Sequence, residues 1–128
     1  ALLCAQHADA VIALAPVTDV HRCFVEELGD QAVAEYFGKN PDPARLEDAS
    51  PIYRVPAATP VLLVHGHADE RVPLTHSGAY LSTVAGATFA PVEMMIVDSD
   101  HFQLATPEHT VWADIHEWLV ALSRAAVA

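Results

Sequence analysis

Three short apolar runs limit the fold of this chain more than any other feature of its sequence. They cover residues 10–15, 60–64 and 92–97, and turn-forming residues bound each of them. Apolar runs of this length are typical of β-strands that are covered on both faces. The sequence therefore predicts three buried strands.

The segments after the second and third runs have the pattern of amphipathic helices. Pro73 suits a helix start and Gly86 a helix end, and the apolar residues between them recur on one face. Thr106 can cap a second helix that opens at Pro107. The apolar stripe of that helix consists of Val111, Trp112, Ile115, Trp118, Leu119 and Leu122. Strands that alternate with helices form right-handed parallel crossovers, so we expect a three-layer α/β fold with helices on the faces of a parallel sheet.

Residues 21–59 interrupt this alternation and are predicted to form an insertion above the sheet. Their apolar residues predict one or two short helices, broken by Gly29 and Gly38. Two interpretations remain open for this segment. It could simply cover the sheet, or it could form a cap over a pocket in which Tyr36 and Phe37 touch a substrate.

Composition and charge exclude several classes of protein. A chain of 128 residues with 52% hydrophobic content can form one domain with a core, and no segment is long and apolar enough to span a membrane. Six Lys and Arg against 17 Asp and Glu give a net charge of −11, which repels nucleic acids and anionic lipid surfaces. Cys4 and Cys23 lack C-x-x-C spacing, so we expect free thiols and a reducing compartment such as the cytoplasm.

A cluster of polar residues directly after the second strand carries the chemistry. The stretch His65-Gly66-His67-Ala68-Asp69 places two imidazoles and a carboxylate within five positions. Two hypotheses account for it. The three side chains could bind a metal ion, or Asp69 could orient a catalytic histidine from another loop.

The order of the strands favours the second hypothesis. If residues 60–64 and 92–97 are parallel neighbours, the loops that follow them leave the sheet at the same edge. Asp69 and His101 then lie side by side. The carboxylate can accept the Nδ1–H of the imidazole while Nε2 faces outward to take a proton, which is two-thirds of a catalytic triad. Each residue alone has a simpler explanation, Asp69 as a turn or capping residue and His101 as a loop residue.

The metal hypothesis depends on a partial motif. The run His65-x-His67-x-Asp69 resembles the ligands of metallo-β-lactamase-like hydrolases, in which imidazoles and carboxylates hold zinc. Glu70 occupies the position of the final histidine in that run, and no later cluster offers a second set of ligands. We therefore expect no metal and no other cofactor.

Taken together, the two loops resemble the C-terminal half of the α/β-hydrolase family. His65-Gly66-x-x-Asp69-x-x-Val72-Pro73 is similar to its acid loop, and Asp100-His101-Phe102 is similar to its histidine loop. Ser50-Pro51 and residues 15–19 fall where similar segments occur in the esterase and dipeptidyl-peptidase-like branches. Residues 100–104 also resemble the arylformamidase-like and small carboxylesterase branches. The resemblance covers nearly the whole chain.

This resemblance implies a role for several residues. Asp69 becomes the acid of the triad, His101 the general base, and Gly66 a residue required for a tight turn. Phe102 joins Tyr36 and Phe37 among the expected substrate contacts. The implied activity is hydrolysis of carboxylic esters or amides by a serine hydrolase.

One element of the family pattern is absent from the sequence. The family places its nucleophile in a G-x-S-x-G elbow before the acid and the histidine. None of the five serines has glycines in that pattern. Good helix formers fill residues 1–7, which resemble the remainder of the helix after the elbow. We therefore expect that residues 1–128 are the C-terminal part of one hydrolase domain, that the serine and the oxyanion hole lie upstream, and that this N-terminal half is a required partner. A non-catalytic hydrolase fragment remains the alternative.

Overall fold

Three parallel strands form the centre of the molecule. In the computed structural model, which describes residues 1–54, 58–87 and 90–128, the strands are β1 (Val11–Leu14), β2 (Val61–Gly66) and β3 (Val92–Val97). They lie in the order β1-β2-β3, and both neighbouring pairs are parallel. The three predicted strands are thus confirmed. Every residue of β2 is buried, because this strand is central and both of its faces are covered.

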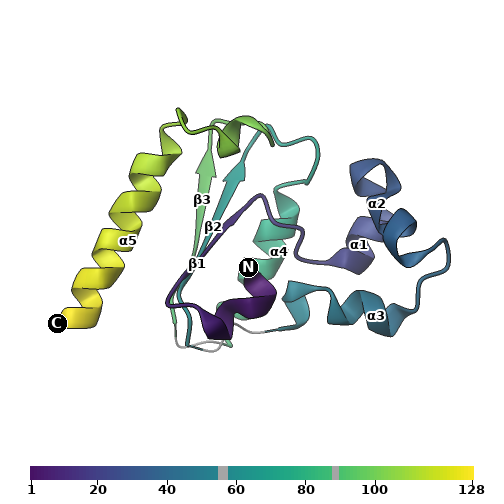
Figure 1. Cartoon of the computed structure of the whole chain (residues 1–128), viewed down its shortest axis with the longest axis horizontal. Coiled ribbons are helices and arrows are strands. Elements are labelled where there is room, and N and C mark those ends of the chain that lie inside the picture. Colours follow the sequence, from purple (N-terminus) through teal and green to yellow (C-terminus); the bar gives the residue numbers. More distant parts are fainter. Residues whose placement is uncertain (55–57, 88–89) are drawn as a thin grey trace.

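Helices cover the two faces of the sheet (Figure 1). On one face, α4 (Thr75–Val84) and the short 3₁₀ helix η1 (Leu2–His7) pack on the sheet, and on the other lies α5 (Val111–Val127). Alternate residues of β2 point to opposite faces: Leu63 packs with Tyr80 and Val84 of α4, whereas Leu62 packs in the cluster of Val111 and Ile115 from α5. The expected three-layer α/β architecture is therefore present.

The start of the last helix differs from the prediction. Residues 103–105 form a 3₁₀ turn, η3, and α5 begins at Val111 rather than at Pro107. The Thr106 hydroxyl donates to the Gln103 carbonyl oxygen at 2.8 Å, so it closes the preceding turn instead of capping a helix. Its own carbonyl accepts the indole N–H of Trp112 at 2.8 Å, which holds residues 106–110 in an irregular connection.

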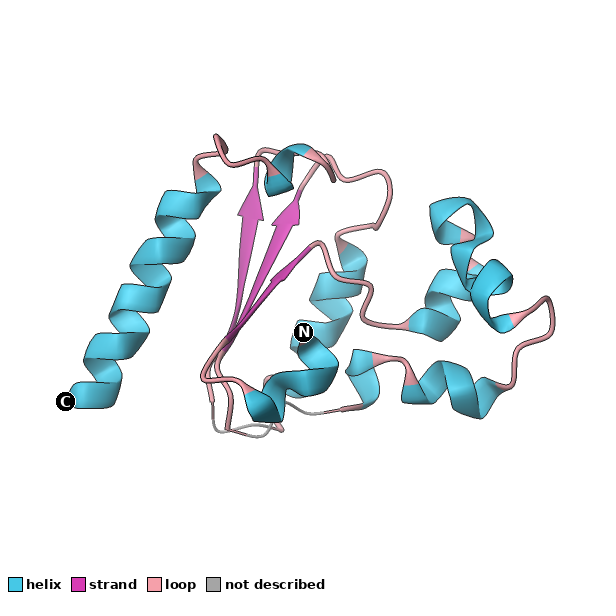
Figure 2. Cartoon of the chain, in the orientation of Figure 1, coloured by secondary structure: helices cyan, strands magenta, loops and turns pink. Residues whose placement is uncertain are grey.

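The insertion consists of four short helical segments on the far side of α4 (Figures 1 and 2). They are α1 (Val20–Val25), α2 (Leu28–Phe37), α3 (Pro43–Asp48) and the 3₁₀ turn η2 (Pro51–Tyr53). The helices expected around Gly29 and Gly38 correspond to α1 and α2, whereas α3 was not anticipated. Residues 55–57 of the predicted insertion lie outside the described residues.

Polar contacts tie the insertion to α4. Arg22 of α1 donates to the Thr75 hydroxyl at 2.6 Å, and Nε2 of buried His76 lies 3.1 Å from the carboxylate of Glu26, just after α1. The buried Thr18 hydroxyl donates to the main-chain carbonyl of His76 at 2.7 Å. The first helix of the insertion is therefore anchored to the body of the fold.

Two further sequence expectations concern membrane spans and cysteines. Among the described residues, no helix combines the length and the hydropathy needed to cross a membrane. Cys4 is exposed and Cys23 is buried, and both are free thiols.

Candidate active site

The loop after β2 holds the Asp69 carboxylate in a fixed orientation. Its Oδ1 accepts hydrogen bonds from the main-chain amides of Arg71 at 2.9 Å and Val72 at 2.8 Å. These contacts are typical of an Asx turn, in which an aspartate bonds to amides two and three residues further along. They leave the second oxygen, Oδ2, available to another loop.

That second oxygen meets His101 in the loop after β3. Nδ1 of His101 lies 2.8 Å from Asp69 Oδ2. Because an ionised carboxylate only accepts hydrogen bonds, Nδ1 carries a proton, and in the neutral form of the ring Nε2 is the nitrogen with the free lone pair. The side chain of Asp69 is fully buried, whereas that of His101 is 29% exposed, and Nε2 has no hydrogen-bond partner in the described part of the chain. This arrangement leaves a basic nitrogen open on the outer side of the ring.

The surroundings of Asp69 favour its ionised form. Burial alone would raise the pKa of this carboxyl group. The Val72 amide, His101 and the Arg71 amide all donate hydrogen bonds to it, and together with the charge of His101 they outweigh burial and lower the pKa. The carboxylate is therefore charged at neutral pH although it is buried.

The turn of the His101 loop is stabilised by Asp100. Its Oδ1 accepts the main-chain amides of Phe102 at 2.8 Å and Gln103 at 2.7 Å. This turn directs the neighbouring imidazole back toward the end of β2.

Direct contacts also hold the two loops against each other. The amide of His67 donates to the Val97 carbonyl at 2.9 Å, and that of Ala68 donates to the Ser99 carbonyl at 3.1 Å. A Cβ atom on Gly66 would lie only 2.2 Å from the Ser99 carbonyl oxygen. Gly66 is therefore needed for this close approach. The predicted reason, a tight turn that only glycine can adopt, does not apply, because the φ angle of Gly66 is not in the left-handed region.

The two histidines of the acid loop have separate environments. His65 is completely buried, with Nδ1 2.8 Å from the Ser77 hydroxyl and Nε2 2.8 Å from the Val72 carbonyl oxygen. The side chain of His67 is 57% exposed, and its Nδ1 lies 3.2 Å from the Val97 carbonyl oxygen. Both nitrogens of His65 are thus engaged by the protein itself. Within residues 1–54, 58–87 and 90–128, no group of three or more His, Cys, Asp or Glu side chains is placed to hold a metal ion.

An apolar pocket of about 320 Å³ opens beside His101. Its lining brings together the insertion and the acid loop. The lining residues are Val17, Cys23, Leu28, Gly29, Ala32, Val33, Tyr36, Phe37, Arg71, Val72 and His101. Tyr36 and Phe37 therefore share one pocket with His101, as the cap interpretation requires.

Phe102 lies outside that pocket. Its side chain is 66% exposed and packs edge-on against the His101 ring, with 5.3 Å between the ring centroids. The guanidinium of Arg71 lies 5.8 Å from the Phe102 ring centroid. A separate depression contains Phe102, His101 and Arg71. Phe102 thus borders the imidazole from another side of the loop.

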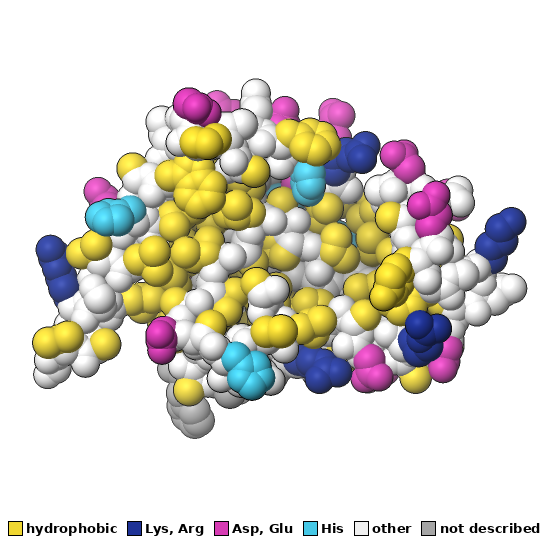
Figure 3. Space-filling view, in the orientation of Figure 1, with side chains coloured by type: hydrophobic (Ala, Val, Ile, Leu, Met, Phe, Trp, Pro, Cys, Tyr) yellow, Lys and Arg dark blue, Asp and Glu magenta, His cyan; other side chains and the backbone are white. Residues whose placement is uncertain are grey.

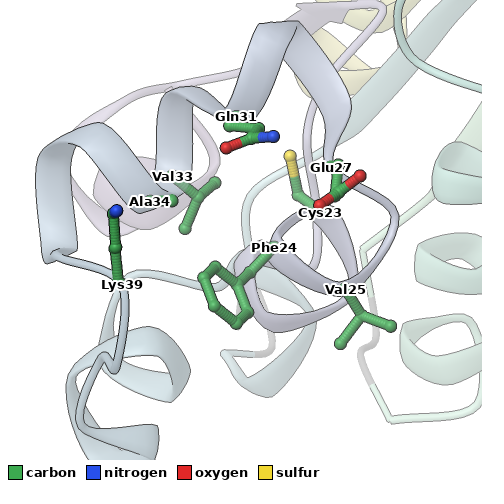
Figure 4. Close-up of a pocket in the computed structure, with 8 residues that line it drawn as sticks. All are labelled: Cys23, Phe24, Val25, Glu27, Gln31, Val33, Ala34 and Lys39. Atoms are coloured by element: carbon green, nitrogen blue, oxygen red, sulfur yellow. The ribbon is translucent and has the colours of Figure 1, made fainter.

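A larger pocket of about 440 Å³ lies within the insertion (Figure 4). All of its lining residues fall between Cys23 and Lys39, on α1, α2 and the turns beside them. Because its lining includes neither Asp69 nor His101, its size does not make it the candidate active site. Cys23 lines both this pocket and the one beside His101.

Comparison with known proteins gives one family match. The profile described as the prolyl oligopeptidase family matches residues 5–124. No curated protein sequence matches the chain significantly.

Solved structures of several hydrolases share the fold. The acetyl ester-xyloside bifunctional hydrolase from Caldicellulosiruptor lactoaceticus matches with a TM-score of 0.69 at 22% identity, over 90% of this chain and 43% of its own. The acylaminoacyl peptidase of Pyrococcus horikoshii gives 0.68 at 22% identity, over 80% of this chain and 17% of its own. Esterase 2 of Thermogutta terrifontis, phosphoramylated by tabun, matches with a TM-score of 0.63 at 20% identity, over 90% of this chain and 42% of its own. The chain therefore spans less than half the length of each of these structures.

Proposed function

Because this chain belongs to the prolyl oligopeptidase family of serine hydrolases, we propose that Asp69 and His101 are the acid and the general base of a hydrolase that cleaves carboxylic esters or amides. The observation that carries this proposal is the 2.8 Å contact between Asp69 Oδ2 and His101 Nδ1. It joins a buried carboxylate to an imidazole whose other nitrogen is free in the described part of the chain. This is the relation that a triad acid and base require.

The nucleophile is assigned to a segment upstream of this chain. All five serine hydroxyls here are engaged elsewhere, with Ser77 on His65 and the others on main-chain carbonyls. None contacts His101, and none stands in a G-x-S-x-G elbow. The partial coverage of the matched structures supports the same assignment.

The reaction follows the usual course of acyl transfer. Nε2 of His101 takes the proton of the serine hydroxyl as the serine oxygen attacks the substrate carbonyl carbon. Asp69 stays ionised and stabilises the imidazolium. The imidazolium then protonates the leaving alcohol or amine as its bond to the carbonyl carbon breaks, which leaves an acyl-enzyme. Water attacks the carbonyl carbon of this ester while His101 takes its proton, and the imidazolium then protonates the serine oxygen as its bond to that carbon breaks, which releases the acid product.

The insertion is assigned the role of a cap that selects the substrate. Tyr36 and Phe37 of α2 line the apolar pocket beside His101, which suits an apolar group next to the scissile bond. Phe102, on the histidine loop, is assigned a contact with the exposed part of the substrate. We take residues 21–59 as the cap and residues 1–128 as the C-terminal part of a single domain.

An upstream half of the fold is also proposed as the partner of this chain. Figure 3 shows hydrophobic side chains gathered over β1 and along the inner side of α5. β1 pairs with β2 along one edge, and its other edge has no strand partner among the described residues. A further strand and its helices would cover this surface.

The cysteines support a reducing compartment. Cys4 is exposed to solvent as a free thiol, and Cys23 is free and buried. Exposed unpaired thiols are typical of reducing compartments. We propose a cytoplasmic location on this basis.

The experiment uses the natural reading frame that contains this chain together with its upstream half. The enzyme should hydrolyse p-nitrophenyl acetate and react with a fluorophosphonate probe. His101→Ala should abolish turnover, and Asp69→Asn should lower kcat by roughly 10⁴-fold, the cost of holding the imidazole in the wrong tautomer. The control is His67→Ala, in the same loop, which should retain activity. Turnover that survives His101→Ala would overturn the assignment.

A further inference from the structure

His65 takes no part in the proposed acid–base pair, yet its ring lies next to the Asp69 carboxylate. It occupies the last-but-one position of β2, four residues before Asp69, and no part of it is exposed. A buried histidine needs partners for both ring nitrogens, because an unpaired polar atom in the interior is costly. His65 has both.

These partners fix which nitrogen carries the proton. The Val72 carbonyl oxygen, 2.8 Å from Nε2, can only accept, so Nε2 carries the hydrogen. Nδ1 of the neutral ring then accepts the hydroxyl hydrogen of Ser77 at 2.8 Å. Ser77 lies in α4 and is itself fully buried. The imidazole is thus held between a helix and the end of the acid loop.

Val72 connects this imidazole to the catalytic carboxylate. Its carbonyl accepts from His65, while its amide donates to Asp69 Oδ1 at 2.8 Å. His65 Nε2 also lies 3.5 Å from Asp69 Oδ2, the oxygen that meets His101. The His65 ring therefore lies beside the carboxylate and bonds to Val72, the residue whose amide holds Asp69 Oδ1.

We propose that His65 and Ser77 are positioning residues, which hold the Asp69 carboxylate in the orientation that His101 needs. This inference rests on the proposed function. Neither residue lines the pocket beside His101, so their effect should fall on kcat rather than on KM. A misplacement of a catalytic group by about 1 Å can lower the rate by about 100-fold.

The kinetic test compares graded variants in the complete enzyme. His65→Leu should lower kcat by about 10- to 100-fold with KM within about twofold. His65→Gln, which keeps an N–H that can reach the Val72 carbonyl, should recover most of the loss. Ser77→Ala should have an intermediate effect, with Ser82→Ala as its control, because the Ser82 hydroxyl only bonds the Gly78 carbonyl of its own helix. In an Asp69→Asn background, His65→Leu should cause no further loss of kcat.

A second readout does not depend on hydrolysis. The proton that His101 Nδ1 shares with Asp69 should give a low-field resonance in ¹H NMR spectra, and His65 should show ¹⁵N shifts of the Nε2–H tautomer. Ser77→Ala should move the His101 resonance, whereas His67→Gln should leave it unchanged. If the enzyme shows no hydrolysis but these shifts occur, the proposed function fails and the positioning role stands. An unmoved His101 resonance in Ser77→Ala and His65→Leu, or additive losses of kcat with Asp69→Asn, would overturn the inference.

Discussion

At the scale of single residues, the candidate site depends on a carboxylate that is buried and charged at the same time. Asp69 is tolerable in this position because each of its oxygens accepts hydrogen bonds, from two amides on Oδ1 and from His101 on Oδ2. Because protonation of this carboxylate would weaken these hydrogen bonds, the free energy of unfolding should depend on pH.

The pKa of Asp69 predicts the sign of that dependence. Folding lowers this pKa below its ordinary value of 3.8, so the folded state favours the ionised carboxylate. The resulting stabilisation is fully present above about pH 5 and is lost as the pH falls through the folded-state value. Urea unfolding between pH 3 and pH 7 should therefore show a steeper acid loss for the native sequence than for Asp69→Asn. Asp114→Asn, on the exposed face of α5, is the control and should leave the slope unchanged; an equal slope in all three would contradict this prediction.

Gly66 predicts a second residue-scale effect. Its missing side chain allows the Ser99 carbonyl to approach the end of β2, and a methyl group would meet main-chain atoms that cannot move aside. Gly66→Ala should lower the free energy of unfolding by about 2–3 kcal/mol or more. Gly78→Ala, inside α4 with no atom within 4 Å of the added Cβ, should raise it by about 0.5–1 kcal/mol. Denaturant melts of both variants measure the difference, and equal effects would contradict the steric explanation.

The contact between Asp69 and His101 could be predicted from the sequence, whereas the roles of their neighbours Gly66 and His65 could not. Asp69 and His101 each follow an apolar run, and parallel pairing of those runs is sufficient to bring them together. The need for Gly66 comes from Ser99, 33 positions away, and the engagement of His65 comes from Ser77 on a helix and from a main-chain carbonyl. No local pattern encodes such contacts, so on sequence grounds a role of His65 as a metal ligand stayed open as the less favoured alternative.

At the scale of elements, regular segments followed the hydrophobic pattern and irregular ones did not. The strands and α4 lie where their apolar periodicity placed them, because burial against a sheet decides their position. The predicted start of α5 was wrong. Thr106 and Pro107 satisfy the sequence rules for a helix start, but the hydroxyl of Thr106 bonds to Gln103 and its carbonyl to Trp112 instead. Other hydrogen bonds to residues nearby in the sequence outweighed the capping propensity there.

The first turn of α2 carries backbone strain. Three consecutive residues, Gly29, Asp30 and Gln31, have φ angles of 64°, 57° and 66°, in the left-handed region. A non-glycine residue there costs of order 1 kcal/mol. Gln31→Gly should therefore be neutral or raise the free energy of unfolding by up to about 1 kcal/mol. Glu35→Gly, in the right-handed part of the same helix, should lower it by about 1 kcal/mol. Thermal unfolding by circular dichroism distinguishes them, and a loss of similar size in both would contradict the left-handed turn.

At the scale of the whole molecule, the two hydrophobic clusters pack on the two faces of β2. Hydrophobic side chains also lie on the surface over β1 (Figure 3). An unpaired strand edge next to apolar surface is prone to pair with another chain. Residues 1–128 expressed alone should self-associate and should not react with a fluorophosphonate, because no serine contacts His101. Size-exclusion chromatography beside the longer protein is the measurement. A monomeric, probe-reactive chain of 128 residues would show that the nucleophile lies within it.

The complete burial of β2 has a consequence for how the parts of the molecule open. Asp69 lies in the loop after β2, and His101 lies in the loop after its paired neighbour β3. In contrast, α2, which carries Tyr36 and Phe37, has no buried residue. In hydrogen–deuterium exchange, amides of β2 should be protected close to the limit of global unfolding, and those of α2 should exchange orders of magnitude faster through local opening. Asp69 and His101 would then stay in contact while the wall of the pocket rearranges, so that in the proposed enzyme α2 would adapt to substrates of different size without disturbing that contact.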